Sequence, residues 1–244
     1  MPILDNREAH LTRFEALRQS RDLRTAAFDM VGGGDYERVG FTEQYLLDTF
    51  APVPENGLLV DVGCGPGRLA RYLTERPRLR YLGTDIVPEL LDVARTECLR
   101  PDWRFEAVTG FEIPCESGSA DVVTIFSIFT NMLPEQSFLL VREAARVLRP
   151  GGTVLITYFD ISFPGHNQIF LNLVEHQAQR IDPLVFLNRD FIETFATGNG
   201  LTLKLNLSPE EARTNDTRRF RLLDGREVED KLTLNQALAI LSKP

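Results

Sequence analysis

Three glycines and an aspartate have the most informative spacing in this sequence. Gly63, Gly65 and Gly67 directly follow the apolar run Leu58–Val62, and the residues after them are typical of a helix. Such a turn brings backbone amides and a helix N-terminus close to a small ligand. Asp85 stands twenty residues after Gly65, at the end of a second apolar run. A glycine turn with a carboxylate at that distance is typical of nucleoside binding, in which the acid accepts both ribose hydroxyls.

The spacing within the turn distinguishes the kinds of nucleotide site. A dinucleotide-binding turn needs a third glycine where this chain has Arg68, and Pro66 lies inside the turn. No Gly-Lys-Ser or Gly-Lys-Thr triplet follows, so the turn is not a phosphate-binding P-loop. Two plainer explanations stay open. The glycines could simply turn the chain, as in any doubly wound domain, and Asp85 could simply cap the helix after it.

Several stretches together resemble the class I S-adenosylmethionine-dependent methyltransferase family. The glycine turn resembles the family's motif I, and Asp85 stands at the acidic end of the second strand. Residues 120–127 resemble the fourth strand, and residues 146–156, which contain Pro-Gly-Gly, resemble the approach to the fifth. Residues 33–40 resemble a segment before motif I in a bacterial subgroup of these enzymes. The resemblance implies S-adenosylmethionine as the cofactor.

The resemblance also implies the fold, an α/β Rossmann-like sheet of seven mostly parallel strands with helices on both faces and an N-terminal helical cap. The last strand would be antiparallel and inserted between the fifth and the sixth. The apolar patterns of the chain predict strands at 58–62, 80–84, 103–107, 121–126, 153–159, 201–207 and 234–241. They predict helices at 3–29, 42–50, 67–75, 88–98 and 135–148, and one capped by Asn188.

We expect one methyltransferase domain over residues 1–244. Its parts would be a helical cap at 1–50, a cofactor-binding core at 51–159, a substrate-side insertion at 160–187 and a segment at 188–244 that completes the sheet. Ligands of open α/β sheets bind outside the carboxyl ends of the strands. Substrate selection is therefore expected in the cap and in the insertion.

Each part of the cofactor can be assigned to residues that match the family's motifs. Amides near Gly63 and Gly65 would donate to its carboxylate, and Asp61 would organise the turn or reach its ammonium through water. Asp85 would take the ribose diol. Phe126 and Ser127 would approach the methionine part. The full expected set is Tyr36, Arg38, Asp61, Gly63, Cys64, Gly65, Asp85, Ile86, Thr109, Gly110, Phe111, Phe126 and Ser127.

Two parts of this assignment depart from the common pattern or have an alternative. Thr109 stands where the family often has an aspartate, so adenine recognition would depend on the backbone of Gly110 and Phe111. In the early loop, Tyr36 would cover the cofactor and Arg38 would meet its carboxylate. The alternative is a surface loop with one buried ring.

Methyl transfer is an in-line displacement at carbon that depends mainly on alignment, although a hydroxyl acceptor benefits from a general base. The candidate catalytic residues are Tyr158, Asp160, His166 and Asn131. Many small-molecule members have a histidine where this chain has Asn131, and His166 has an alternative role as a packing residue. The form of residues 127–135 resembles members that act on sugars, lipids or secondary metabolites, through oxygen or nitrogen.

Composition limits the remaining possibilities. The net charge of −8 and the isoelectric point near 5.0 argue against a nucleic-acid partner, and no apolar run is long enough to span a membrane. Cys64, Cys98 and Cys115 show no metal-ligand spacing, so we expect no metal, and they fit the cytoplasm. The oligomeric state and the acceptor stay open. The alternative functions are a non-catalytic scaffold that binds the cofactor and an NAD-dependent oxidoreductase, which Pro66 and Arg68 disfavour.

Overall fold

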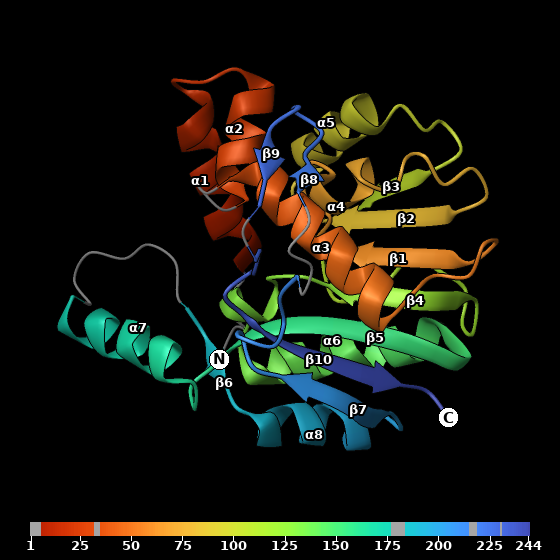
Figure 1. Ribbon diagram of the computed structural model, residues 1–244, viewed down its shortest axis with the longest axis vertical. Helices are drawn as coiled ribbons and strands as arrows, with labels where there is room; N and C mark the ends of the chain where they lie inside the picture. The colour runs from red at the N-terminus through yellow and green to blue at the C-terminus, as the bar shows by residue number, and fades with distance from the viewer. Residues whose placement is uncertain (1–5, 32–34, 177–183, 215–218, 230) are drawn as a thin grey trace.

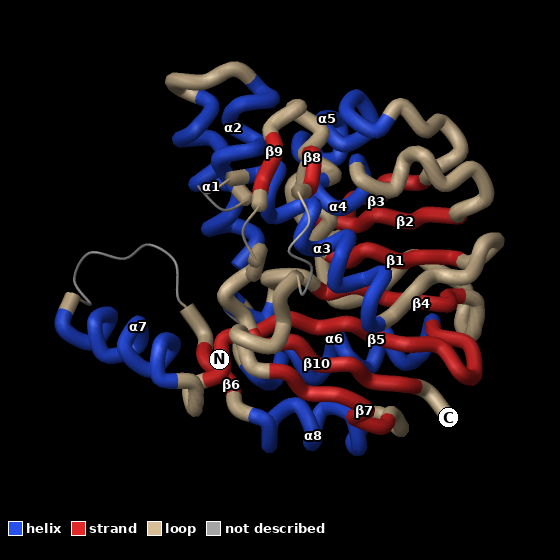
Figure 2. The backbone as a smooth tube through the Cα atoms, in the orientation of Figure 1, coloured by secondary structure: helices blue, strands red, loops and turns tan. Residues whose placement is uncertain are grey.

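The computed structural model describes residues 6–31, 35–176, 184–214, 219–229 and 231–244, and its centre is a twisted β-sheet (Figures 1 and 2). Seven strands lie in the order β3-β2-β1-β4-β5-β10-β7, and the short β6 pairs with β5 beside this path. The strands are β1 Leu58–Val62, β2 Arg80–Asp85, β3 Arg104–Ala107, β4 Ala120–Ile125, β5 Leu148–Asp160, β6 Phe186–Leu187, β7 Thr202–Leu207 and β10 Ala237–Ser242.

The strand directions confirm the expected topology. Strands β3, β2, β1, β4 and β5 are parallel neighbours. Strand β10 is antiparallel to both β5 and β7, so the last strand is inserted between the fifth and sixth long strands, as expected. The start of β10 therefore lies at the same edge as the carboxyl ends of the parallel strands, where ligands bind in open α/β sheets.

Helices cover both faces of the sheet because successive strand residues point to opposite sides. In β1, Leu59 packs in the layer that contains α3, α4 and α5, whereas Val60 packs in the layer that contains α6 and α8 (Figure 1). The helices are α1 Asn6–Arg18, α2 Leu23–Met30, α3 Tyr36–Phe50, α4 Arg68–Arg71, α5 Pro88–Cys98, α6 Pro134–Val147, α7 Pro164–Glu175 and α8 Arg189–Gly198, with a 3₁₀ turn η1 at Phe129–Asn131. Within the described residues, no helix is both long and apolar enough to cross a bilayer.

The N-terminal cap contains helices, but their boundaries differ from the prediction. The single helix expected at 3–29 is divided into α1 and α2, because Asp22 caps α2 by accepting a hydrogen bond from the Thr25 amide at 3.0 Å. The helix expected to start at Thr42 starts at Tyr36 instead, with Asp35 as its cap. The Thr42 hydroxyl lies inside α3 and donates to the Arg38 carbonyl at 2.7 Å.

Helix α4 is shorter than predicted, whereas the predicted cap of helix α8 is confirmed. The helix predicted at 67–75 is the single turn α4, because turns with hydrogen bonds such as Leu73 amide to Ala70 carbonyl follow it. Helix α8 is capped by Asn188 as predicted, since its side chain accepts from the Phe191 amide at 3.1 Å. Phe191 itself is exposed rather than directed into the core.

The segment between β7 and β10 returns across the molecule to the N-terminal cap. It contains the hairpin of β8 (Phe220–Arg221) and β9 (Glu227–Val228), which lies over α3 (Figure 1). Leu222, Val228 and Leu232 form a small apolar cluster with Phe41 of α3. The hairpin segment is therefore packed against α3 of the N-terminal cap.

Candidate functional site

A cavity of about 820 Å³ opens at the carboxyl edge of the parallel strands. Its wall combines the ends of β1, β2, β4 and β5 with residues of α1, α3 and α5 and the segment before β10. Cavities of roughly 300–1,000 Å³ are typical of small-ligand sites. The fold therefore provides a ligand-sized space where the sequence predicted one.

The glycine turn forms one wall of this cavity and needs glycine for two reasons. Gly63, Gly65 and Gly67 have φ angles of +71°, +55° and +83°. Residues that carry a Cβ adopt such angles only at a cost in free energy. A Cβ on Gly63 would also lie 2.2 Å from Cδ1 of Ile128, and one on Gly65 would lie 2.9 Å from Cγ1 of Val31. Both the curvature of the turn and its close packing therefore depend on these glycines.

The amides of the turn, which the sequence predicts as donors to the cofactor carboxylate, have acceptors within the chain in this structure. The amides of Gly63 and Cys64 both donate to the Thr84 carbonyl, at 2.8 and 2.9 Å. The Gly65 amide donates to Oδ2 of Asp85 at 2.9 Å. In this structure the turn thus contributes shape to the site and ties β1 to β2.

Asp85 is buried at the end of β2 and lines the cavity. Its Oδ2 accepts from the Gly65 amide and its Oδ1 from the Val87 amide, each at 2.9 Å. Burial raises the pKa of this carboxyl, against the opposing effect of the two amides. Each carboxylate oxygen has a second lone pair, so the group retains acceptor capacity. Asp85 therefore orders the chain before α5 and also borders the cavity.

Asp61, on β1, is the second buried acid in the cavity wall. The Tyr81 hydroxyl donates to its Oδ2 at 2.7 Å, and the Thr124 hydroxyl donates to its Oδ1 at 2.8 Å. Burial raises the pKa of Asp61 to about 7, although both hydroxyls favour the ionised form. This acid is therefore positioned by the two strands that flank β1.

The region beyond Asp85 contains the residues expected around adenine and two that the sequence did not indicate. Ile86 and the segment 109–111 line the cavity. His10 and Arg13 of α1 also line it. In the sequence these two residues stand among other charged residues of α1, and no local signal separates them from the rest.

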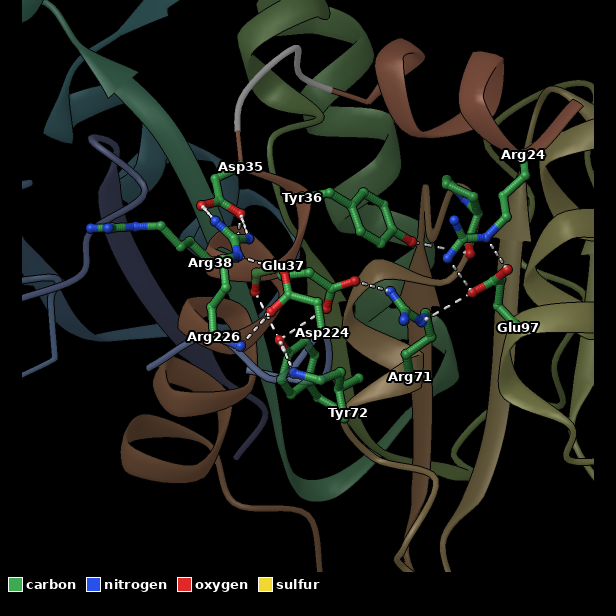
Figure 3. Close-up of polar contacts among 12 residues, drawn as sticks. Arg24, Asp35, Tyr36, Glu37, Arg38, Arg71, Tyr72, Glu97, Asp224 and Arg226 are labelled. Atoms are coloured by element: carbon green, nitrogen blue, oxygen red, sulfur yellow. Dashed lines mark hydrogen bonds and ion pairs between the residues drawn. The ribbon is translucent and has the colours of Figure 1, made fainter. Parts of the chain in front are cut away.

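Tyr36 and Arg38 do not line the cavity; their surroundings appear in Figure 3. The Tyr36 ring stacks on Phe28 with centroids 3.8 Å apart, and its hydroxyl donates to the Pro66 carbonyl at 3.2 Å. Tyr36 therefore contacts the glycine turn without lining the cavity.

Arg68 is the arginine that α4 contributes to the cavity wall. Its Nε donates to Oε2 of Glu43 at 3.1 Å, and its Nη1 donates to the Val31 carbonyl at 2.7 Å. In the sequence, Arg68 indicates only a break in the dinucleotide pattern. The buried pair with Glu43 instead ties the cap helix α3 to the turn.

The opposite end of the cavity is lined largely by apolar and neutral polar side chains. Phe126, Ser127 and Asn131 line it as expected. The other lining residues at this end are Ile128, Thr130, Met132, Gln136, Leu140, Phe159, Leu184, Thr233, Leu234, Asn235 and Gln236. Residues from β4, β5, α6 and the start of β10 therefore form this second compartment.

Three of the four candidate catalytic residues, all of them except Asn131, do not line the cavity. His166 is 2% exposed, with Nδ1 2.9 Å from the Asp160 amide and Nε2 2.8 Å from the Asn235 carbonyl. The Tyr158 hydroxyl donates to Oδ1 of Asn206 at 2.9 Å. The Asp160 carboxylate accepts from the Ser162 amide at 2.9 Å. Their assignment as bases stays a prediction that this geometry does not favour, whereas Asn131 lies at the cavity.

Part of the chain matches a known protein family. Residues 60–156 match the methyltransferase domain family. Over 131 residues the chain is 33% identical to demethylmenaquinone methyltransferase of Deinococcus radiodurans, an alignment that covers 52% of this chain and 54% of that protein. The match thus spans about half the length of that curated relative.

Two solved structures show the same fold at lower identity. One is a chain from the complex between the Haloferax volcanii Trm112 methyltransferase activator and a methyltransferase. Its sequence is 21% identical, the TM-score is 0.66, and the alignment covers 91% of this chain and 98% of that one. The other is magnesium protoporphyrin IX methyltransferase of Synechocystis PCC 6803 with bound SAH. Its sequence is 12% identical, the TM-score is 0.62, and the alignment covers 96% of this chain and 94% of that one. These matches show that residues 60–156 resemble a methyltransferase domain, and that the fold, with its glycine turn, the acid after β2 and the inserted antiparallel strand, is shared with the two solved structures.

Proposed function

We propose that this chain transfers the methyl group of S-adenosylmethionine to a small-molecule acceptor, at oxygen or nitrogen. The observation that supports this most is the shared cavity of about 820 Å³, which joins two compartments. One contains the glycine turn, Asp61 and Asp85, and the other is formed by neutral residues such as Asn131 and Gln236. An adenosyl amino acid and an acceptor could then meet between the ends of β1 and β4.

The residues at the first compartment fit the parts of the cofactor. The spare lone pairs of Asp85 would accept the ribose hydroxyls, and Ile86 and residues 109–111 would surround the adenine. Asp61 would attract the cofactor ammonium, which would favour its ionised form. Because the turn amides have partners within the chain, we propose that other polar groups of the cavity wall bind the cofactor carboxylate.

Methyl transfer depends mainly on the alignment of the acceptor with the methyl group and the sulfur of the cofactor. The cofactor supplies an activated methyl group on a sulfonium, which is a good leaving group. Holding the acceptor in line with it contributes roughly 7–11 kcal/mol to lowering the barrier. Ile128, Met132 and Phe159 would exclude water from the acceptor compartment, and its carboxamides would orient the acceptor.

The substrate class rests on two relatives' names and on the nature of the wall. Demethylmenaquinone and magnesium protoporphyrin IX are the acceptors named for two similar proteins, and both are small molecules. We propose a sugar, a lipid or a secondary metabolite as the acceptor class for this chain. A cytoplasmic location is proposed because Cys64, Cys98 and Cys115 are all free thiols.

Binding and transfer can be tested separately. S-adenosylhomocysteine and S-adenosylmethionine are expected to raise the melting temperature of the purified chain, whereas NAD should not. Stabilisation by NAD alone would rule out the proposal. Incubation of the chain with methyl-labelled S-adenosylmethionine and a deproteinised metabolite extract should then label a small molecule. Cofactor binding without any labelled product would favour the non-catalytic scaffold instead.

A further inference from the structure

Two loops from distant parts of the chain meet at the acceptor compartment. Ser127 follows β4 in a left-handed conformation, with φ of +59°. Its amide donates to the Thr157 hydroxyl of β5 at 2.8 Å, and its carbonyl accepts from the Thr130 hydroxyl at 2.7 Å. The Gln236 carboxamide, just before β10, donates through Nε2 to the Ser127 hydroxyl at 2.9 Å. The polar side of the compartment therefore includes Ser127, whose backbone conformation is strained and whose amide and carbonyl both have hydrogen-bond partners.

Gln236 keeps hydrogen-bonding capacity for a ligand. It is 9% exposed and lines the cavity. A carboxamide has two N–H donors and two acceptor lone pairs. In the described part of the chain, the Gln236 side chain has Ser127 as its hydrogen-bond partner: its Nε2 donates to the Ser127 hydroxyl at 2.9 Å, and that hydroxyl lies 3.3 Å from its Oε1. At most one donor and one acceptor lone pair of the carboxamide are used. The remaining donor suits an acceptor molecule that carries a carbonyl or hydroxyl oxygen next to an apolar body.

The backbone that presents Gln236 is held by a buried histidine. Asn235 has φ of +52°, and its carbonyl lies 2.8 Å from Nε2 of His166. A carbonyl oxygen only accepts, so Nε2 must carry the hydrogen. Nδ1 lies 2.9 Å from the Asp160 amide and 3.1 Å from the Asp160 carbonyl. It can accept from the former when neutral or donate to the latter when charged, so the contact with Asn235 holds in both charge states.

The surroundings of His166 fit support rather than proton transfer. The imidazole is 2% exposed and does not line the cavity. Its ring contacts Phe159 and Phe163 edge-on, with centroids 4.9 and 5.1 Å apart. It lies in the first turn of α7 and connects the end of β5 with the segment before β10. It therefore joins two segments that both border the acceptor compartment.

We propose that His166 is a positioning residue, which holds the Asn235 carbonyl and thereby fixes Gln236 where its carboxamide meets the acceptor. This inference rests on the proposed function, because it assumes that the acceptor occupies the compartment next to Ser127. The role of Gln236 is to select an acceptor with a neutral oxygen. His166 itself does not touch the acceptor.

Two substitutions in the full-length chain separate positioning from general support. His166→Gln can place an amide donor where Nε2 lies and keep the contact with Asn235. His166→Asn reaches only as far as Nδ1 and keeps only the contact with Asp160. Each variant loses one hydrogen bond to the backbone, so their melting temperatures should fall by similar amounts. Their affinity for S-adenosylhomocysteine should match that of the unaltered chain, because the Asp85 end is unchanged.

The local readout is amide hydrogen exchange at Asn235 and Gln236, measured by NMR. Exchange there should be roughly fivefold to tenfold faster in His166→Asn than in His166→Gln, since only the former loses the bond to Asn235. Equal exchange rates in the two variants would overturn the positioning role. This comparison needs no cofactor, so it stands even if S-adenosylhomocysteine fails to bind, a result that would remove the proposed function alone.

A measurement on the unaltered chain covers the case in which both variants misfold. The imidazole of His166 should carry a slowly exchanging hydrogen on Nε2 at both pH 6 and pH 8. An Nε2 without a hydrogen at either pH would overturn the inference. With the acceptor from the labelling experiment, His166→Asn should raise KM for that compound severalfold while His166→Gln leaves it near the original value. Equal KM values would likewise contradict the role of Gln236.

Discussion

The two ends of the cavity are built in different ways. The end with the glycine turn is formed mainly by the last residues of β1 and β2 and by the short runs after β1, β2 and β3. The lining residues there are 61–64, 68–69, 84–87, 90 and 108–111. The other end combines residues 126–132 with Phe159, Leu184 and residues 233–236. The first depends on where parallel strands end, and the second on how distant segments pack. A backbone-level motif can therefore predict the first but not the second.

The largest expected effect is the pH dependence of folding stability that Asp61, a buried acid at the first end, causes. Burial raises the pKa of Asp61 to about 7 in the folded chain, against about 3.9 in an unfolded one. The folded state then binds a proton more tightly, so the contribution of Asp61 to stability falls as pH rises from about 4 to about 7. At 1.36 kcal/mol per pKa unit, the change is on the order of 3 kcal/mol.

Asp61→Asn should remove this dependence, because the amide does not titrate over that range. Urea unfolding of both proteins at intervals from pH 4 to pH 8 measures it, and the difference between the two curves isolates Asp61 from other acids. The stability of the original chain should fall relative to the variant as pH rises. A flat or rising difference would mean that Asp61 is ionised throughout, and that this end is less dry than its burial indicates.

The same contrast explains what could be predicted. The strands and the residues Asp61, Asp85 and Phe126 could be located because each stands at a strand end with a sequence signature. Gln236 could not, since nothing in the sequence shows that the side chain just before β10 reaches Ser127, which follows β4 on the other side of β5. His10 and Arg13 were missed because α1 is placed over the cavity by packing of Phe14 against α2 and α5, which is a tertiary effect.

The roles of individual residues were harder to predict than their positions. Amides of the glycine turn were expected to face a ligand, but the Thr84 carbonyl and Asp85 take them up. His166 was one candidate base with a packing role as the alternative, and it is buried in the first turn of α7. A sequence pattern indicates which groups are present, whereas their hydrogen bonds depend on neighbours that are distant in the chain.

Gly63→Ala tests the dependence of the first end on backbone shape. Gly63 and Gly118 share a φ of +71°, but a Cβ on Gly63 would lie 2.2 Å from Ile128, whereas one on Gly118 meets nothing within 4 Å. Gly118→Ala should cost about 1 kcal/mol for the left-handed conformation alone. Gly63→Ala should cost about 2–3 kcal/mol, because Ile128 must also move. Urea unfolding measures both, and equal costs would show that the turn accommodates a methyl group.

Asp85→Ala should weaken S-adenosylhomocysteine binding by roughly tenfold to a hundredfold, as expected for lost hydrogen bonds to a charged group. The ribose hydroxyls would lose their acceptor, and the Gly65 and Val87 amides would lose theirs. Asp160→Ala is the matched control, since Asp160 also ends a parallel strand but does not line the cavity. Calorimetry should show little change for that control. Equal losses in both variants would remove the ribose role of Asp85.

The smallest effect is expected where neither end is touched, at the joint between the cap and the C-terminal hairpin (Figure 3). Arg226 donates to both carboxylate oxygens of Asp35, at 2.6 and 2.7 Å, and to Asp224 at 2.6 Å. Its side chain is half exposed, so water screens these pairs.

Arg226→Gln should therefore lower the melting temperature by less than about 2 °C. This difference should shrink when salt is raised to about 0.5 M. Arg219→Gln, on the same hairpin and more exposed, is the control and should change less. The affinity for S-adenosylhomocysteine should stay the same in both, because α3 is also held to the turn by the buried Glu43–Arg68 pair. A severalfold loss of affinity in Arg226→Gln alone would show that the hairpin holds the cap over the cofactor, and the cavity would then depend on three regions rather than two.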